Sequence, residues 1–162
     1  MAANWEKLVI SNFGEASSKY NNSAYLQKMY ANKLVEHCSK QLIKPGLWVD
    51  LGSGTGFLAD ALEENNPHQD VIRIDGSQHM LQKHDSSKKT KQFDLSSGLP
   101  NFKESPTLIA SNFALHWLPK PNETLKEWFT ALAPQGWLAI VLPVKGSFPE
   151  WHEAAIKADV NC

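Results

Sequence analysis

The sequence predicts an α/β fold built on a mostly parallel sheet, and three observations support this. An apolar strand runs directly into a glycine-rich turn and a helix over residues 47–58. Further short apolar segments then alternate with helical patterns, which is typical of βαβ units. The chain has 162 residues, 42% of them hydrophobic, which suits one domain with a buried core.

The first 45 residues are predicted to be helical. An initial helix is indicated by apolar residues at helical spacing, namely Trp5, Leu8, Val9 and Phe13, and it is expected to break at Phe13-Gly14. A longer helix is expected over residues 23–42, ending at Lys44-Pro45-Gly46. Its buried side is expected to consist of Tyr25, Leu26, Met29, Tyr30, Leu34 and Cys38. These helices either pack on the sheet as structural material or form a lid over a cleft.

The glycine-rich turn has the spacing G-x-G-x-G, with Gly52, Gly54 and Gly56. A dinucleotide fingerprint would be G-x-G-x-x-G, so a nicotinamide oxidoreductase is disfavoured. Glycine accepts the positive φ of a tight strand-to-helix turn. Without side chains a ligand can approach the backbone, and the helix that follows presents unpaired N–H groups.

A second strand is predicted over residues 71–75, and it ends in Asp75. This carboxylate follows Gly52 by about 20 residues, the offset at which related α/β folds bind a nucleotide ribose. Ribose hydroxyls donate and a carboxylate accepts, so the pairing is chemically apt. The alternative is that Asp75 caps a helix. The basic run that follows is expected to be a solvated face, or to meet an acidic partner: Lys83, His84, Lys88, Lys89 and Lys91.

Three more strands are expected, over residues 92–95, 106–112 and 137–142, and a last helix begins within residues 146–155. An amphipathic helix precedes the fifth strand, with its apolar face formed by Leu125, Trp128, Phe129 and Leu132. Ligands of parallel sheets bind beyond the carboxyl ends of the strands. The groups expected to converge there are Gly52–Gly56, Asp75, Asp94 and Asn112.

Composition excludes several function classes. The net charge of −1 and the single arginine, Arg73, argue against nucleic-acid binding. No apolar run is long enough to cross a membrane. The two cysteines, Cys38 and Cys162, suggest no disulfide framework and favour the cytoplasm. His152-Glu153 resembles the start of a zinc-protease helix, but Ile156 stands where the second histidine would be, so no metal is expected.

The Val49-Asp50-Leu51 segment before the glycines, together with Asp75, Ser77, Met80 and Leu81 spaced as D-x-S-x-x-M-L, resembles class I S-adenosylmethionine-dependent methyltransferases. The resemblance implies a Rossmann-like fold and S-adenosyl-L-methionine as cofactor. It implies cofactor contacts from Asp50, Gly52, Ser53, Gly54, Gly56, Asp75, Gly76, Met80, Asp94, Leu95 and Asn112, with Asp94 facing the adenine amino group. It also places Phe113–Leu118 beside the methyl donor, where His116 is either a base or a packing residue.

Three further segments resemble the malonyl-acyl-carrier-protein O-methyltransferases of biotin synthesis: residues 13–20 with 26–27, residues 112–117 and residues 146–152. The resemblance implies that the free carboxylate of a malonyl group on a carrier protein is methylated. A carboxylate is already ionised at neutral pH, so its reaction needs alignment and desolvation more than a general base. Tyr20 matches a family tyrosine near the reacting centre, and it either orients the acceptor or packs in the lid.

One departure from the family concerns the end of the chain. Class I methyltransferases normally have seven strands, the last two forming an antiparallel hairpin, and only five are predicted here. The strand at 137–142 is therefore expected to be an exposed edge, covered by a partner or by a second copy in a homodimer. The expected organisation is a helical lid over residues 1–45, a cofactor-binding core over 46–143 and a truncated C-terminal helix over 144–162.

Two alternatives stay open at this point. The chain is either a class I methyltransferase for another small acceptor, or a non-catalytic S-adenosylmethionine-binding domain that a partner chain completes.

Overall fold

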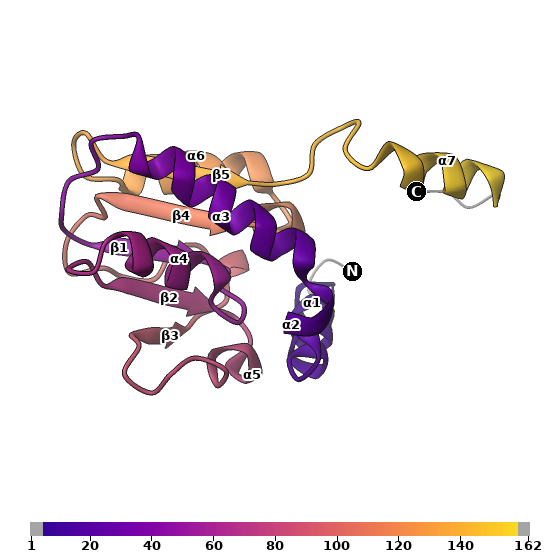
Figure 1. Cartoon of the computed structure of the whole chain (residues 1–162), viewed down its shortest axis with the longest axis horizontal. Coiled ribbons are helices and arrows are strands. Elements are labelled where there is room, and N and C mark those ends of the chain that lie inside the picture. Colours follow the sequence, from indigo (N-terminus) through magenta and orange to yellow (C-terminus); the bar gives the residue numbers. More distant parts are fainter. Residues whose placement is uncertain (1–4, 159–162) are drawn as a thin grey trace.

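The computed structural model describes residues 5–158, and its centre is a five-stranded sheet in which every strand pair is parallel. The strands are β1 (Trp48–Leu51), β2 (Val71–Asp75), β3 (Thr90–Gln92), β4 (Leu108–Asn112) and β5 (Trp137–Val141). Their order is β3-β2-β1-β4-β5, so β1 is central and β5 lies at an edge (Figure 1). The predicted parallel α/β fold is confirmed.

Helices cover both faces of the sheet and make a three-layer structure (Figure 1). Side chains alternate between the faces of each strand, so Trp48 and Val49 belong to different cores. On one face α3 (Tyr25–Ser39) and α4 (Phe57–Asn65) pack against Trp48, Val71 and Leu108. On the other face α6 (Pro121–Ala131) inserts the fully buried Trp128 against Val49, Leu51 and Ile109.

Five further elements lie at the carboxyl ends of the strands. They are α1 (Trp5–Ala16), α2 (Tyr20–Ser23), α5 (Gln78–Leu81) and the 3-10 turns η2 (Leu95–Ser97) and η3 (Leu115–Trp117). Figure 1 shows α1 and α2 beyond the tips of the strand arrows. The final helix α7 (Pro149–Lys157) stands away from the sheet at the end of an extended segment.

The N-terminal helices differ from the prediction in two respects. The first helix continues through Gly14. A side chain at this position would meet Ser77 and His79 at about 3.1 Å, so the glycine allows α1 to approach α5. The expected long helix corresponds to α3, which runs from Tyr25 to Ser39, and a separate short helix, α2, precedes it. Tyr25 is 77% exposed, and the fully buried residues of this helix are Ala31 and Val35.

The third strand also differs, since it covers residues 90–92 and not 92–95. Asp94 instead accepts a hydrogen bond from the Ser96 N–H (2.9 Å) and caps η2. A side chain that caps a short turn in this way competes with continuation of the strand.

The edge strand β5 pairs with β4 alone in the part of the chain described. Trp137 is 38% exposed, and Phe129 on the neighbouring α6 is 69% exposed although the amphipathic pattern predicted its burial. No helix between residues 5 and 158 has the length and apolar character needed to cross a bilayer. Cys162 lies outside the described residues, as do the side chains of Trp151 and His152.

Candidate functional site

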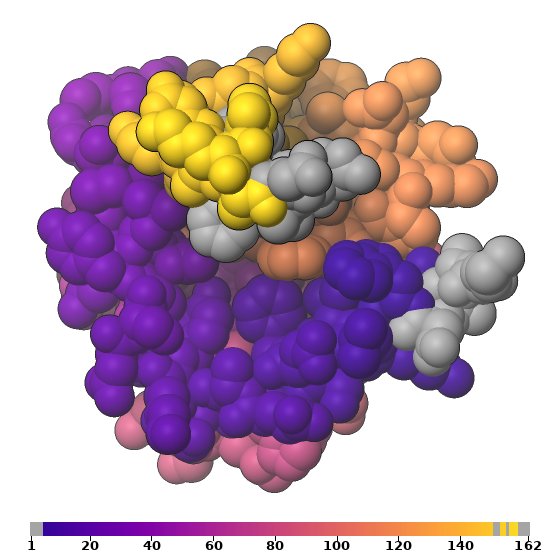
Figure 2. All heavy atoms as spheres, turned by 90° about the vertical axis from the view of Figure 1, so that its right-hand side faces the viewer, coloured from indigo at the N-terminus to yellow at the C-terminus, as the bar shows by residue number. Residues whose placement is uncertain are grey.

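A cavity of about 110 Å³ lies where the carboxyl ends of β1, β2 and β4 meet the N-terminal helices. Figure 2 looks onto this end of the molecule, where the indigo and violet N-terminal residues form much of the lower part of the face. The lining residues are Val9, Ile10, Phe13, Tyr20, Gly52, Gly54, Asp75, Gly76, Met80, Asp94, Leu95, Asn112, Phe113, Ala114, Trp117 and Leu118.

The glycine loop forms the floor of this cavity. The N–H groups of Gly52 and Ser53 both donate to the Ile74 carbonyl (2.8 and 3.0 Å), which ties the loop to β2. Gly52 has φ +73°, and a Cβ on it would overlap the Ala114 side chain. Gly54 has φ +53°, and a Cβ there would meet nothing within 4 Å. The loop therefore presents bare backbone to the cavity.

Asp75 lies at the end of β2 and is held by two backbone amides. Its Oδ2 accepts from the Gly54 N–H and its Oδ1 from the Ser77 N–H, both at 2.8 Å. Burial raises the pKa of this carboxyl. Ser77, and not Asp75, caps α5, because its hydroxyl accepts from the Met80 N–H (3.4 Å). Each Asp75 oxygen keeps a lone pair for a further donor such as a ribose hydroxyl.

A second, smaller cavity of about 30 Å³ shares Tyr20, Gly52, Gly54 and Asn112 with the first. Asp50 and Ser53 line it and are almost completely buried. Both carboxylate oxygens of Asp50, the Ser53 Oγ and the Asn112 Oδ1 have no hydrogen-bond partner among the described residues. Buried polar atoms of native proteins are normally satisfied, so this group of acceptors indicates a missing donor.

The ionisation of Asp50 is strongly perturbed by its burial. Burial raises its pKa to about 7, although the Arg73 guanidinium favours the charged form. A cationic group bound in the smaller cavity would replace the lost hydration and stabilise the carboxylate.

Aromatic side chains form the outer wall of the main cavity. Phe13 of α1 lies edge-on to Trp117 (5.7 Å between centroids) and to Tyr20 (6.1 Å). Tyr20 in turn stacks on Phe57 (6.4 Å). Burial, together with the nearby Asp75 carboxylate, raises the pKa of Tyr20, so its hydroxyl stays protonated at neutral pH. The wall shields the cavity from water on the side of the N-terminal helices.

His116 packs between two aromatic side chains, Trp117 (4.9 Å) and Phe113 (6.3 Å), and lines neither cavity. Its Nδ1 is buried and has no hydrogen-bond partner within residues 5–158. Burial lowers the pKa of the ring, which favours neutral imidazole. Phe113 beside it has φ +55°, a strained value for a non-glycine residue, and such strain often occurs at functional sites.

Most of the residues that the sequence singles out are brought together. The main cavity is lined by nine of them, Tyr20, Gly52, Gly54, Asp75, Gly76, Met80, Asp94, Leu95 and Asn112, while Asp50 and Ser53 line the smaller one. Gly56 lines neither cavity; it has φ +105° and caps α4. Sequence reasoning missed the contribution of α1 through Val9, Ile10 and Phe13, because periodicity does not reveal what an apolar face covers.

His84 was expected on a solvated basic face, and this prediction is wrong. Its Nε2 lies 2.9 Å from the Gly54 carbonyl oxygen, and the ring is half-buried against the glycine loop. Its position in a lysine-rich run gave no signal of this contact.

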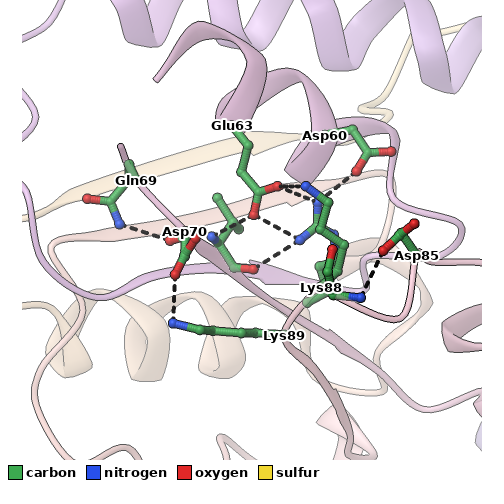
Figure 3. A network of polar contacts seen from close by, with 10 residues as sticks. Asp60, Glu63, Gln69, Asp70, Asp85, Lys88 and Lys89 are labelled. Carbon is green, nitrogen blue, oxygen red and sulfur yellow. Dashed lines mark hydrogen bonds and ion pairs between the residues drawn. The ribbon is translucent and has the colours of Figure 1, made fainter. Parts of the chain in front are cut away.

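A polar network lies beside the site, and Figure 3 shows Asp60, Glu63 and Lys88 within it. The single arginine of the chain, Arg73, belongs to this network. Arg73 is fully buried and bonds Glu63 (2.9 Å) and Asp60 (2.7 Å) on α4. Lys88 also bonds Glu63 (2.6 Å), and these partners hold the pKa of Glu63 down at about 2 against the effect of burial. The network fixes α4 to β2, and with it the glycine loop between β1 and α4.

The sheet order, the glycine loop after β1 and the carboxylate that ends β2 define the fold of class I S-adenosylmethionine-dependent methyltransferases. The family model described as "Methyltransferase domain" matches residues 23–159, and the chain belongs to this family.

Curated relatives include enzymes with different acceptors. The chain is 33% identical over 113 residues to trans-aconitate 2-methyltransferase of Mycobacterium tuberculosis, covering 68% of this chain and 41% of that protein. It is 28% identical over 139 residues to malonyl-[acyl-carrier protein] O-methyltransferase 1 of Coxiella burnetii, covering 86% of this chain and 48% of that protein. The chain thus spans less than half the length of these relatives.

Solved structures agree on the fold. The DhpI-SAM-HEP complex has a TM-score of 0.68 at 18% identity, covering 92% of this chain and 70% of that one. The plantazolicin methyltransferase BpumL, in complex with a pentazolic analogue and SAH, has a TM-score of 0.68 at 17% identity, covering 86% and 56%. Within the described residues, no group of histidine, cysteine and acidic side chains is arranged to hold a metal ion.

Proposed function

We propose that the two adjacent cavities bind S-adenosyl-L-methionine and that the chain acts as an S-adenosylmethionine-dependent O-methyltransferase. One observation carries the proposal: an open glycine loop, the ribose-type carboxylate Asp75 and the unpartnered carboxylate Asp50 line two cavities that share four lining residues. Two structural neighbours, DhpI and BpumL, are complexes that contain SAM or SAH.

The donor and acceptor groups present fit this cofactor. Asp75 would accept from the ribose hydroxyls, and Asp94 and Leu95, which line the same cavity, would contact the adenine. The unsatisfied oxygens of Asp50 and Asn112 would accept from the ammonium group of the methionine part. When bound, the cofactor would supply an electrophilic methyl group on a sulfonium centre.

The surrounding residues suit transfer to an acceptor that is already anionic. The aromatic wall of Phe13, Tyr20 and Trp117 would exclude water, which favours a reaction in which opposite charges cancel. We propose that the Tyr20 hydroxyl orients the acceptor. Direct participation of His116 as a base is less well supported, because its ring lines neither cavity and an ionised carboxylate needs no base.

A malonyl group on acyl carrier protein is the acceptor we propose, as the Coxiella burnetii relative suggests. The charged residues that line the main cavity are Asp75 and Asp94, and no lysine or arginine of the described chain joins them. A tricarboxylate such as trans-aconitate would need cationic partners, and Arg73 is already engaged by Glu63 and Asp60. A singly charged carboxylate needs fewer cationic partners.

The domain organisation belongs to the same proposal. Residues 1–45 would form a lid, since α1 covers the main cavity, residues 46–143 the cofactor-binding core and residues 144–162 a C-terminal helix. A cytoplasmic setting is part of this proposal as well.

Two alternatives have separate support. Another small acceptor is compatible with the same cofactor site, as the trans-aconitate relatives illustrate. A non-catalytic domain completed by a partner or a second copy is compatible with the exposed β5 edge. A structural neighbour with a TM-score of 0.67 and 19% identity is a complex with the Haloferax volcanii Trm112 methyltransferase activator.

The test is to incubate the chain with S-adenosylmethionine and either malonyl-acyl carrier protein or trans-aconitate, and to measure methyl ester and S-adenosylhomocysteine by mass spectrometry. We expect the malonyl ester to form, and Asp75→Ala to abolish it. Ester on trans-aconitate alone would contradict the acceptor assignment. Cofactor binding without turnover of either acceptor would favour the non-catalytic alternative.

A further inference from the structure

His84 contacts two glycines of the cofactor loop from a position just after α5. Its Nε2 lies 2.9 Å from the Gly54 carbonyl oxygen. Its Cε1 and Nδ1 lie 2.8 and 2.9 Å from the point where a Cβ on Gly56 would stand. The ring therefore packs against the loop in space that only a glycine at position 56 leaves free.

The contact completes a clamp on Gly54. The Gly54 N–H donates to Asp75 Oδ2 (2.8 Å), while its carbonyl faces the His84 Nε2. Both backbone groups of this residue are thus fixed at φ +53°, a conformation that glycine adopts without strain but does not strongly prefer. The clamp selects one loop conformation out of several that the glycines permit.

The chemistry of the contact defines the state of the ring. A carbonyl oxygen only accepts, so the His84 Nε2 must carry the proton and donate. Burial lowers the pKa of His84, which favours the neutral ring. With a carbonyl facing Nε2, this neutral ring is the tautomer protonated on Nε2. Three charged groups, Arg73, Asp60 and Asp75, lie near enough to influence it.

His84 does not touch the space proposed for the cofactor. It lines neither of the two adjacent cavities and instead borders a surface hollow with Thr55, Asp60 and Lys88. Any effect on the ligand must therefore pass through the loop.

We propose that His84 is a positioning residue for the cofactor: its Nε2–H fixes the Gly54 carbonyl and so holds the glycine loop in the conformation that, with Asp75, receives the adenosyl group. This inference rests on the proposed function, since it assumes that the loop binds the cofactor. It predicts that affinity depends on a side chain that makes no contact with the ligand.

The test is calorimetric titration of the whole chain with S-adenosylhomocysteine, using wild type, His84→Ala, His84→Gln and His68→Ala. We expect His84→Ala to weaken binding about tenfold, the effect of one lost hydrogen bond of roughly 1.4 kcal/mol. His84→Gln keeps an N–H donor at a similar reach and should recover affinity to within about threefold of wild type. His68 is exposed and serves as the matched control, with unchanged affinity.

Unchanged binding by a folded His84→Ala variant would overturn the inference. So would failure of His84→Gln to bind more tightly than His84→Ala, since packing alone would then explain the loss.

A second measurement separates this inference from the proposed function and does not depend on any variant folding. Ring nitrogen NMR of the ligand-free wild-type protein should show His84 protonated on Nε2, and a ring protonated on Nδ1 alone would refute the clamp. If wild type does not bind S-adenosylhomocysteine at all, the proposed function fails, and the inference about cofactor affinity fails with it. The NMR result then shows only whether the His84–Gly54 contact exists.

Discussion

Gly52 and Gly54 both have positive φ, but the two positions require glycine for different reasons. At Gly52 a side chain would overlap Ala114, whereas at Gly54 it would stand in open space beside the cavity. The first glycine is required by packing within the protein. The second leaves room for a ligand.

Substitution by alanine should separate these two requirements. We expect Gly54→Ala to fold with a loss of about 1 kcal/mol from the left-handed backbone, and to lose most of its affinity for S-adenosylhomocysteine. Gly52→Ala should lose substantially more stability, because the clash with Ala114 adds to the backbone strain. Urea denaturation and calorimetric titration of both variants check this. Equal destabilisation of the two would contradict the assignment.

The buried carboxylate of Asp50 is expected to lower the stability of the ligand-free protein and to strengthen cofactor binding. Burial raises its pKa from 3.8 to about 7, so the folded state favours the protonated form. The stability linked to this proton is present in full below about pH 4 and is lost as the pH rises through about 7. At higher pH the folded protein carries an unfavourable buried charge.

Asp50→Asn should therefore raise the free energy of unfolding of the ligand-free protein at pH 8 by about 2 kcal/mol, which is part of the roughly 4 kcal/mol that corresponds to the pKa shift. The substitution should have little effect at pH 4. The same variant should bind S-adenosylhomocysteine weakly, since the charge that faces the ammonium group is gone. Urea denaturation at the two pH values measures the first effect, with the exposed Glu64→Gln as control. A variant less stable than wild type at pH 8 would contradict this reading.

At the scale of single elements, β1, its glycine turn and α4 could be predicted from the sequence because the signal is local. A buried apolar strand, glycines at alternate positions and an apolar helical face are all encoded within 20 residues. The course of α1 through Gly14 could not be predicted, since the glycine serves contact with Ser77 and His79 far along the chain. The third strand was misplaced because the capping bond of Asp94 ended it early.

The attachment of α4 to β2 depends on Arg73. We expect Arg73→Ala to lower the free energy of unfolding by about 3–5 kcal/mol, because Glu63 is then left largely buried without its main partner. Lys89→Ala, which breaks only the exposed pair with Asp70, should cost less than about 1 kcal/mol. Urea denaturation compares the two, and similar losses would show that burial of the pair is unimportant.

The same network gives a pH dependence of opposite sign to that of Asp50. The pKa of Glu63 is lowered from 4.5 to about 2, so its contribution to stability is present above about pH 4.5 and is lost as the pH falls toward 2. In Arg73→Ala this acid sensitivity should diminish.

At the scale of the whole molecule, the site is assembled from segments that are far apart in the sequence. The parallel sheet brings the ends of β1, β2 and β4 together, and this convergence could be predicted from fold class alone. The closing wall could not, because the sequence pattern of α1 shows an apolar face without showing that Val9, Ile10 and Phe13 line the cavity. The position of His84 behind the loop likewise follows only from tertiary packing.

The central claim is that this end of the sheet is a formed cofactor site, and calorimetric titration with S-adenosylhomocysteine tests it most directly. We predict micromolar binding by the wild-type chain and a loss of about 2 kcal/mol or more in Asp75→Ala, which leaves the ribose hydroxyls without their acceptor. Binding that is unaffected by Asp75→Ala would place the ligand elsewhere. No binding by the folded wild-type chain would contradict the claim outright.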